Sequence, residues 1–177
     1  MEDPFEQAME PVVARLREAV EENPAFEVVA SGILYQERYT LAMGVECRRT
    51  EGQFRELTLE LRCGRTHLPD GRGWIGGHVW WHRDRRPERT VYEMRAEDVH
   101  YEGEPPLALF AERLAALEQA MRLALKRGAP PGLTHRVLIM ESEPGWGVRL
   151  DEVIEFASRD EARRYADKTP DAHLEGP

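Results

Sequence analysis

The chain has 177 residues, 41% of them hydrophobic and 32% charged, and a formal net charge of −9 at pH 7. This composition is typical of a globular protein, because disordered chains contain fewer apolar residues. The negative charge argues against a general nucleic-acid binder, which needs concentrated positive charge. No apolar run approaches the ~18 residues that cross a bilayer, and the acidic start Met1–Pro4 lacks the basic segment of a secretory signal. We therefore expect a cytoplasmic protein.

Three segments of the sequence have helical patterns. Each starts with residues that favour a helix N-terminus and continues with apolar residues at helical spacing. The expected helices begin at Pro4, Pro105 and Ser158, and they end before Asn23, Gly128 and Thr169. The central helix is the longest of the three, and the last one is short.

Strand-like segments, rich in β-branched and aromatic residues or in alternating apolar positions, fill the rest of the chain. They are Phe26–Tyr35, Tyr39–Cys47, Leu57–Cys63, Gly73–His82, Thr90–Met94, His135–Met140 and Val148–Phe156. We expect the last of them to break near Leu150. The short turns between the first five predict an antiparallel meander, because parallel strands need longer crossover connections. The sequence therefore predicts an α+β fold: an antiparallel sheet of about five to seven strands with an N-terminal helix, a long central helix and a short C-terminal helix.

We expect one α+β domain over residues 1–170, followed by a flexible tail at residues 171–177. The stiff connector Gly128–Gly132 is an alternative boundary between two subdomains. The piece that follows this connector is too short to be expected to fold as an independent domain.

The two cysteines, Cys47 and Cys63, fall on neighbouring predicted strands. Aligning the apolar residues of these strands places Cys47 opposite Leu57 and Cys63 opposite Leu41. The two sulfur atoms are then several residues apart along the sheet, beyond the reach of a disulfide. We predict two buried free thiols.

Lysine and asparagine are both rare in this arginine-rich chain, with lysine only at Lys126 and Lys168 and asparagine only at Asn23. Sparing use of thermolabile amides in a highly charged chain is typical of thermophilic proteins. We therefore expect a thermophilic source, which is an inference about origin and not about activity.

The segment Gly73–His82 holds three of the four tryptophans and two of the six histidines. Read as a strand, it places Trp74, Gly76, His78, Trp80 and His82 on one face and Ile75, Gly77, Val79 and Trp81 on the other. Aromatic rings beside bare glycine backbone favour binding, so Trp74, His78, Trp80 and His82 are the candidate ligand-binding residues. The alternative is that some of these tryptophans fill the core under a helix and the histidines are ordinary sheet residues. His78 and His82 lie ~13 Å apart along a strand, so we predict no metal site.

Catalytic motifs are missing from the sequence. It contains no GxSxG, Walker or GxGxxG pattern. The acidic residues between Glu93 and Glu102 are expected to be solvated rather than to form an acid–base pair. We predict no catalytic residue and no cofactor.

The central helix carries an apolar stripe that approximates a heptad repeat: Leu107, Phe110, Leu114, Leu117 and Met121. Two interpretations remain open for it. The stripe packs on the sheet of its own chain, or it forms the seam of a homodimer. The second interpretation makes these five residues the candidate partner-binding residues.

The leading hypothesis for function is a non-enzymatic cytoplasmic binding or adaptor protein that engages a protein or peptide partner as a homodimer. In size, acidity and element order the chain resembles small α+β chaperone and adaptor folds such as type III secretion chaperones. This resemblance concerns layout, covers no motif and implies no functional residue.

Two alternatives belong to other classes. The first is a small-molecule pocket, with or without enzymatic activity, at the strand that carries Trp74 and His78. The second is binding of single-stranded nucleic acid through the arginine-rich turn, where Arg83, Arg85, Arg86 and Arg89 lie beside the tryptophans. The net negative charge makes nucleic acid the weaker alternative.

Overall fold

The computed structural model describes residues 3–52, 54–86, 90–133, 135–145, 147–156 and 158–176. The elements in chain order are α1 (Pro4–Glu21), β1 (Phe26–Gln36), β2 (Thr40–Arg49), β3 (Thr58–His67), β4 (Arg72–His82), β5 (Thr90–Glu102), α2 (Leu107–Arg127), β6 (His135–Glu143), β7 (Gly147–Phe156), α3 (Arg159–Lys168) and β8 (Ala172–Leu174). The strands form antiparallel sheets of five and three strands. The predicted α+β class, with its N-terminal, long central and short C-terminal helices, is confirmed.

The chain divides into two compact units, Met1–Ala129 and Pro130–Pro177, which we name the N-terminal unit and the C-terminal unit. Each unit has its own cluster of buried hydrophobic residues. The boundary between the units, after Ala129, falls in the proline- and glycine-rich connector Gly128–Gly132. One domain over residues 1–170 stays a prediction; within the predicted tail at 171–177, residues 172–174 form β8.

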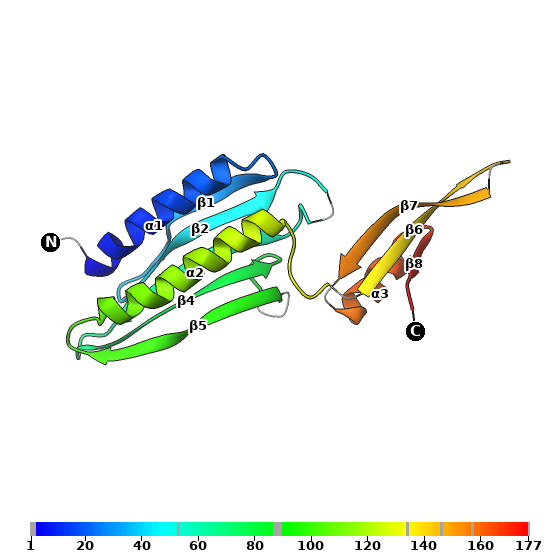
Figure 1. The fold of residues 1–177 in the computed structure, drawn as a ribbon. Helices are drawn as coiled ribbons and strands as arrows, with labels where there is room; N and C mark the ends of the chain where they lie inside the picture. Colours follow the sequence, from blue (N-terminus) through cyan, green and yellow to red (C-terminus); the bar gives the residue numbers. More distant parts are fainter. Residues whose placement is uncertain are drawn as a thin grey trace. The chain divides into compact units, whose positions relative to one another are not determined.

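The N-terminal unit is a five-stranded sheet in the order β1-β2-β3-β4-β5, so the predicted meander is confirmed. Figure 1 shows α1 and α2 side by side on one face of this sheet. The apolar side chains of both helices and of one sheet face form a single core. The other sheet face is the one that holds the candidate site.

Both helices of this unit follow from local sequence signals. The carboxylate of Asp3 accepts a hydrogen bond from the Phe5 backbone N–H at 2.9 Å and caps α1. Gly128 ends α2 in the left-handed conformation, with φ 71°. The residues buried by the helices are Phe5, Met9, Val12, Val13, Leu16 and Val20 of α1 and Phe110, Leu114, Leu117, Met121 and Leu125 of α2. No helix among the described residues is long and apolar enough to span a membrane.

A glycine in β4 lets α2 approach the sheet closely. A Cβ atom at Gly77 would lie 2.9 Å from Cδ1 of Leu117 and 2.6 Å from Sγ of Cys63. Real side chains do not tolerate such contacts, so a larger residue would push α2 away. Gly77 therefore belongs to the packing face of β4, as the predicted alternation requires.

The predicted pairing of β2 with β3 is wrong by two residues. Cys47 lies opposite Leu59 rather than Leu57, and Cys63 lies opposite Met43 rather than Leu41. A slip of two residues keeps every side chain on its own face, so apolar alignment alone does not detect it. Both cysteines are free and buried, as predicted, and burial raises the pKa of Cys63 to about 12.

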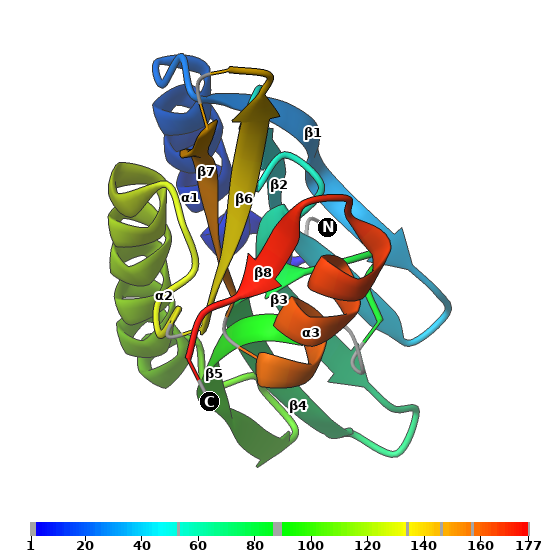
Figure 2. The ribbon, with the colours of Figure 1, turned by 90° about the vertical axis from the view of Figure 1, so that its right-hand side faces the viewer.

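The C-terminal unit is a three-stranded sheet in the order β7-β6-β8, and α3 packs on one face of it. Figure 2 shows β8 beside β6, where it pairs with Val137–Ile139. The predicted break near Leu150 is wrong, because β7 is continuous from Gly147 to Phe156; the strand instead has a bulge there, with Asp151 as the extra residue at a register shift. The buried core of this unit consists of Val137, Ile154, Phe156 and Ala162.

Candidate functional site

The face of the five-stranded sheet that lies away from α1 and α2 is named the open face. It carries Glu46 of β2, Glu60, Arg62 and Gly64 of β3, Trp74, Gly76, His78, Trp80 and His82 of β4, and Glu93 and Arg95 of β5. The predicted alternation of β4 is confirmed, because Ile75, Val79 and Trp81 lie in the hydrophobic core. The four candidate ligand-binding residues therefore share one face, and their roles depend on their neighbours.

His82 is fully buried, and both of its ring nitrogens are bonded. Nδ1 accepts a hydrogen bond from the backbone N–H of Arg85 at 2.9 Å. Nε2 lies 2.8 Å from Oε2 of Glu60, so this nitrogen carries the proton and donates it. With both nitrogens engaged, His82 positions Glu60 and the β4–β5 turn and offers no polar atom to a ligand.

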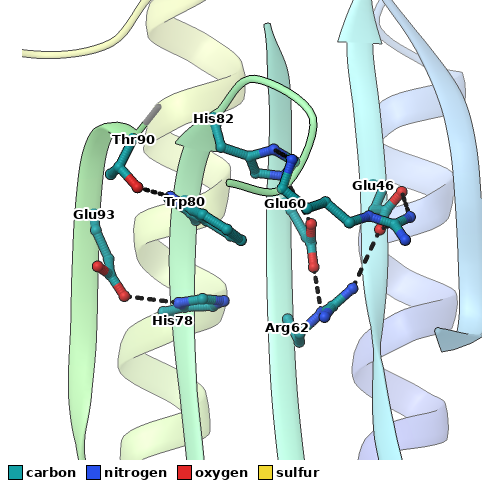
Figure 3. Close-up of polar contacts among 9 residues, drawn as sticks. Glu46, Glu60, Arg62, His78, Trp80, His82, Thr90 and Glu93 are labelled. Atoms are coloured by element: carbon teal, nitrogen blue, oxygen red, sulfur yellow. Dashed lines mark hydrogen bonds and ion pairs between the residues drawn. The ribbon is translucent and has the colours of Figure 1, made fainter. Parts of the chain in front are cut away.

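Glu60 and Glu46 are buried carboxylates that lie opposite each other on β3 and β2. Nε of Arg62 lies 2.5 Å from Oε1 of Glu60, and its Nη2 lies 3.5 Å from Oε1 of Glu46. Arg85 donates a hydrogen bond from Nη2 to Oε2 of Glu46 at 2.5 Å. Figure 3 shows the Arg62 side chain with dashed lines to Glu60 and to Glu46. The two negative charges are thus matched by two positive ones, as buried charges require.

The environment of Glu60 shifts its pKa in two directions. Burial raises the pKa, because it penalises the charged form. The hydrogen bond from His82 and the charges of the neighbouring cations outweigh burial, and the net pKa lies below the ordinary glutamate value. Glu60 is therefore an anion held in place by its partners.

The turn that supplies Arg85 has an uncommon backbone. Asp84 and Arg85 both have φ of 54°, a left-handed conformation that non-glycine residues rarely adopt. In this conformation the Arg85 N–H reaches His82 and the guanidinium reaches Glu46. The network of Glu46, Glu60, Arg62 and His82 thus holds this turn against the sheet.

Trp80 lies between two histidine rings and is 7% exposed. Its ring centroid is 5.0 Å from that of His78 and 4.1 Å from that of His82. Its Nε1–H donates to Oγ1 of Thr90 at 2.9 Å. Trp80 is therefore enclosed among its neighbours, and its indole N–H is already used.

His78 keeps one free ring nitrogen. Nδ1 lies 2.8 Å from Oε1 of Glu93, which fixes the proton on this nitrogen when the ring is neutral. The hydrogen bond from His78 lowers the pKa of Glu93 below its ordinary value, and Nε of Arg95 lies 3.1 Å from the same oxygen. Nε2 of His78 has no hydrogen-bond partner among the described residues, so it presents a lone pair.

Beside His78 the open face has a hollow of about 250 Å³, and its floor is formed by glycine. A Cβ atom at Gly64 would meet nothing closer than 3.9 Å, which leaves the space above it open. At Gly76 a Cβ atom would lie 2.0 Å from Oδ1 of Asp98, so that carboxylate covers the backbone there. The walls are Arg62, His78 and Arg95 on one side and Thr40, Thr66 and Trp74 on the other.

The structure thus separates the four candidate ligand-binding residues into two pairs. Trp74 and His78 line the hollow, and Trp74 is 38% exposed. Trp80 and His82 belong to the bonded network next to it. Only the first pair presents atoms that a ligand can contact.

Sequence reasoning missed the residues that complete the hollow. Arg62, Gly64 and Thr66 come from β3, and their place beside β4 depends on register, which the sequence does not specify. Asp98 was predicted to be solvated and is exposed, and it lies at an irregular step where β5 passes Gly76. The sequence did contain one signal for this face. Glu46 of β2 and Glu60 of β3 alternate with apolar residues, and a charged residue at such a position indicates a sheet face that no helix covers.

The candidate partner-binding stripe lies mostly inside the N-terminal unit. Phe110, Leu114, Leu117 and Met121 are buried in the core, and Leu107 is half-buried at its margin. These side chains pack on the sheet of their own chain, which is the first of the two interpretations given above. The large hydrophobic residues that α2 exposes are Leu109 and Leu123.

The arginine-rich turn has its charges partly engaged. Arg85 bonds Glu46, and Arg83 lies 3.5 Å from Glu56. Arg86 is exposed, and Arg89 lies outside the described residues. Among the described residues, no group of three or more histidine, cysteine or acidic side chains is placed to hold a metal ion.

These features define an α+β protein with one helix-covered sheet face and one polar face that contains a hollow. Comparisons with family models, with curated proteins and with solved structures found no match to this chain. The assignment of function therefore depends on the chemistry of the site.

Proposed function

We propose that this chain is a cytoplasmic binding protein that holds a small, cyclic, polar molecule in the hollow of the open face. The observation that carries the proposal is the exposed Trp74 ring beside a glycine floor, with the free Nε2 of His78 across the hollow. A flat surface next to bare backbone accepts a ring, and convergent polar groups orient it.

The charges around the hollow favour a ligand without a large net charge. Arg62 and Arg95 are paired with glutamates, and Asp98 contributes one further negative charge. Such walls offer hydrogen-bond donors and acceptors together, and their charges balance except for that of Asp98. A ring with hydroxyl or amide groups, as in a sugar or a nucleoside, matches them better than a phosphate does.

The size of the hollow limits the ligand. Its volume of about 250 Å³ is just below the range of about 300–1,000 Å³ of drug-sized sites. Arg62 and Thr66 are four residues apart on β3, which separates the walls by ~13 Å. The hollow therefore accepts a single ring system lying over Gly64.

The test is a panel of monosaccharides and nucleosides, with binding followed by tryptophan fluorescence and by the shift in melting temperature. Gly64→Leu is expected to abolish binding, because the new side chain fills the hollow without meeting another atom at Cβ. Trp74→Ala is expected to weaken it at least about tenfold through lost stacking. Tyr35→Ala is the matched control, since Tyr35 is a similarly exposed aromatic residue outside the hollow.

Two results would contradict the proposal. One is a complete absence of response to the panel at millimolar concentrations. The other is binding that persists unchanged in Gly64→Leu, which would place the ligand elsewhere on the molecule.

A second candidate, self-association, concerns the sheet of the C-terminal unit. Leu138, Met140, Val148, Leu150 and Val153 share the face opposite the one that packs on α3. Val148 is 64% exposed and Leu150 is 51% exposed. A unit with four buried core residues gains stability by covering such a face. A second copy of this chain supplies an equally apolar face, and two-fold symmetry sets the faces against each other.

Light scattering after size exclusion tests this association. The wild-type chain is expected to be a dimer, and Leu150→Glu is expected to be a monomer. Leu123→Glu is the control, because Leu123 of α2 is 57% exposed and lies in the other unit. A wild-type monomer at all concentrations, or a Leu150→Glu dimer, would remove this candidate.

A further inference from the structure

A second cavity lies at one end of the N-terminal unit, away from the open-face hollow, and it has no part in the function proposed above. It is a groove of about 700 Å³, and we name it the end groove. Its lining comes from the start of α1, the β1–β2 turn, the end of β3, the β3–β4 turn and the segment before α2. This volume lies within the range of sites that hold small organic ligands.

One part of the end groove is apolar and stiff. Pro4, Pro69 and Pro105 come from three different segments of the chain, and Leu68, which precedes Pro69, also lines the groove. The ring of Tyr39 adds a flat aromatic surface. Proline has a fixed φ and no side-chain freedom to lose, so these walls keep their shape when a ligand binds.

The other part of the end groove is cationic. Arg38 is exposed, its guanidinium lies 5.2 Å from the centre of the Tyr39 ring, and it pairs with no carboxylate among the described residues. Arg65 binds Asp3 through Nη2, but its buried Nε has no hydrogen-bond partner among the described residues. His67 is bonded to Tyr101 through Nδ1 at 3.1 Å, which leaves Nε2 without a partner there.

The charges of the lining do not cancel. Arg38 and Arg65 contribute two positive charges, and Asp3 contributes one negative charge that is already bonded to Arg65 and to the Phe5 backbone. The excess is therefore positive, in a protein whose net charge is −9. A local positive excess against an acidic background attracts anions selectively.

We infer that the end groove binds an amphipathic anion, in which a carboxylate, phosphate or sulfonate is joined to an apolar body. The anionic group lies against the exposed guanidinium of Arg38, and Arg65 of the lining adds a second positive charge. The apolar body lies over Leu68, Tyr39 and the prolines. A ligand must have both groups to contact both parts of the groove. A purely apolar ligand makes no ion pair with the arginines, and a small inorganic anion leaves the apolar walls exposed to water.

Two fluorescent probes separate these contributions. 8-Anilinonaphthalene-1-sulfonate carries an aromatic body and a sulfonate, and N-phenyl-1-naphthylamine has the same rings without the charge. The wild-type chain is expected to bind the sulfonate about tenfold more tightly than the neutral probe, since a charge-assisted contact to arginine adds to the apolar contact. Raising the salt concentration is expected to reduce this preference.

Three variants locate the probes. Arg38→Ala is expected to remove most of the preference for the sulfonate and to leave the neutral probe unchanged. Leu68→Ala is expected to weaken both probes. Arg55→Ala is the matched control, because it removes an exposed arginine outside the end groove. Arg38 is exposed on a turn, so unchanged circular dichroism is expected to show that its variant folds.

Equal affinity for the two probes, or an Arg38→Ala variant with wild-type affinity for the sulfonate, would overturn this inference. Gly64→Leu distinguishes it from the function of the open face. Sulfonate binding that is lost in Gly64→Leu and kept in Arg38→Ala would place the anion in the open-face hollow and overturn the end-groove site. Sulfonate binding that is lost only in Arg38→Ala supports it, whatever the sugar and nucleoside panel shows.

Discussion

The two faces of the five-stranded sheet bury side chains in opposite ways, and Trp80 and Trp81 show the difference within one strand. Trp81 lies in the hydrophobic core, with its ring 6.4 Å from that of Phe26. Trp80 lies on the open face between His78 and His82. Both tryptophans are buried, although only one is surrounded by apolar residues.

The indole N–H groups of Trp80 and Trp81 also differ between the two faces. That of Trp80 donates to Thr90, whereas that of Trp81 has no hydrogen-bond partner among the described residues. Burial among apolar groups is not directional, so the core tolerates one unmet donor in exchange for a large buried area. Burial among polar groups needs each partner in place. On the core face, the free energy of unfolding should therefore depend on the volume of the buried side chains. On the open face, it should depend on whether each polar side chain keeps its hydrogen-bond or ion-pair partner.

The largest expected effect is that of Trp81→Ala. Removing a fully buried tryptophan leaves a cavity in the core and should lower the free energy of unfolding by about 4 kcal/mol. Urea denaturation followed by circular dichroism measures this loss. Trp80→Ala is the matched comparison and should cost about 2 kcal/mol, because His78 and His82 keep their bonds to Glu93 and Glu60. Equal losses would show that the two faces are buried by the same means.

Glu60→Ala tests the open face by removing one partner. It leaves the buried His82 without its acid and leaves Arg62 with Glu46 as its acidic partner, and we expect a loss of about 2–3 kcal/mol. In the double variant Glu60→Ala/His82→Ala the second substitution should cost less than it does alone, because the bond is already broken. Additive losses in urea denaturation would contradict the network. Glu51→Ala, at an exposed turn, is the control.

The sheet face on which each side chain of a strand lies could be predicted from the sequence, because alternation with period two is a local signal. This is why Trp74, His78, Trp80 and His82 were placed together, and why Trp81 was placed opposite them. Local signals also located α1 and α2 through their caps and apolar spacing. The three-residue strand β8 has no such pattern, since it pairs only with Val137–Ile139.

The neighbours of β4 could not be predicted, because strand register is a tertiary property. A slip of two residues, as between Cys47 and its partner Leu59, keeps the pattern and changes every cross-strand contact. The hollow depends on such contacts, since Gly64 must lie opposite Gly76 and Arg62 opposite His78. The left-handed turn at Asp84 and Arg85 was not predicted either, because it contains no glycine and arginine rarely adopts this conformation.

Acidification should lower the free energy of unfolding by weakening the contacts of the open face before those of the core. The expected loss is smaller than that of Trp81→Ala or of Glu60→Ala. The pKa values of Glu60 and Glu93 both lie below the ordinary value, whereas glutamate in the unfolded chain titrates near about 4.3. The folded state therefore binds fewer protons, and the stabilisation is fully present above about pH 4.3 and is lost as the pH falls through the lower folded values.

The measurement is the free energy of unfolding between pH 6 and pH 3. The wild-type chain should lose stability over the acidic part of this range, and the variant Glu60→Gln/Glu93→Gln should lose less, because it has no charge to neutralise at these two positions. Glu51→Gln serves as the control. A double variant whose pH dependence matches that of the wild type would show that these carboxylates do not carry the effect.

The smallest expected change in stability is that of Trp74→Ala, and it separates binding from folding on the open face. Trp74 is 38% exposed and has one ring contact, with His100 at 6.3 Å, so its removal should change the free energy of unfolding by at most about 0.5 kcal/mol. Trp80→Ala should cost several times more. If Trp74→Ala instead destabilises the chain as much as Trp80→Ala does, the Trp74 ring supports the sheet, and it is not the surface on which a ligand stacks.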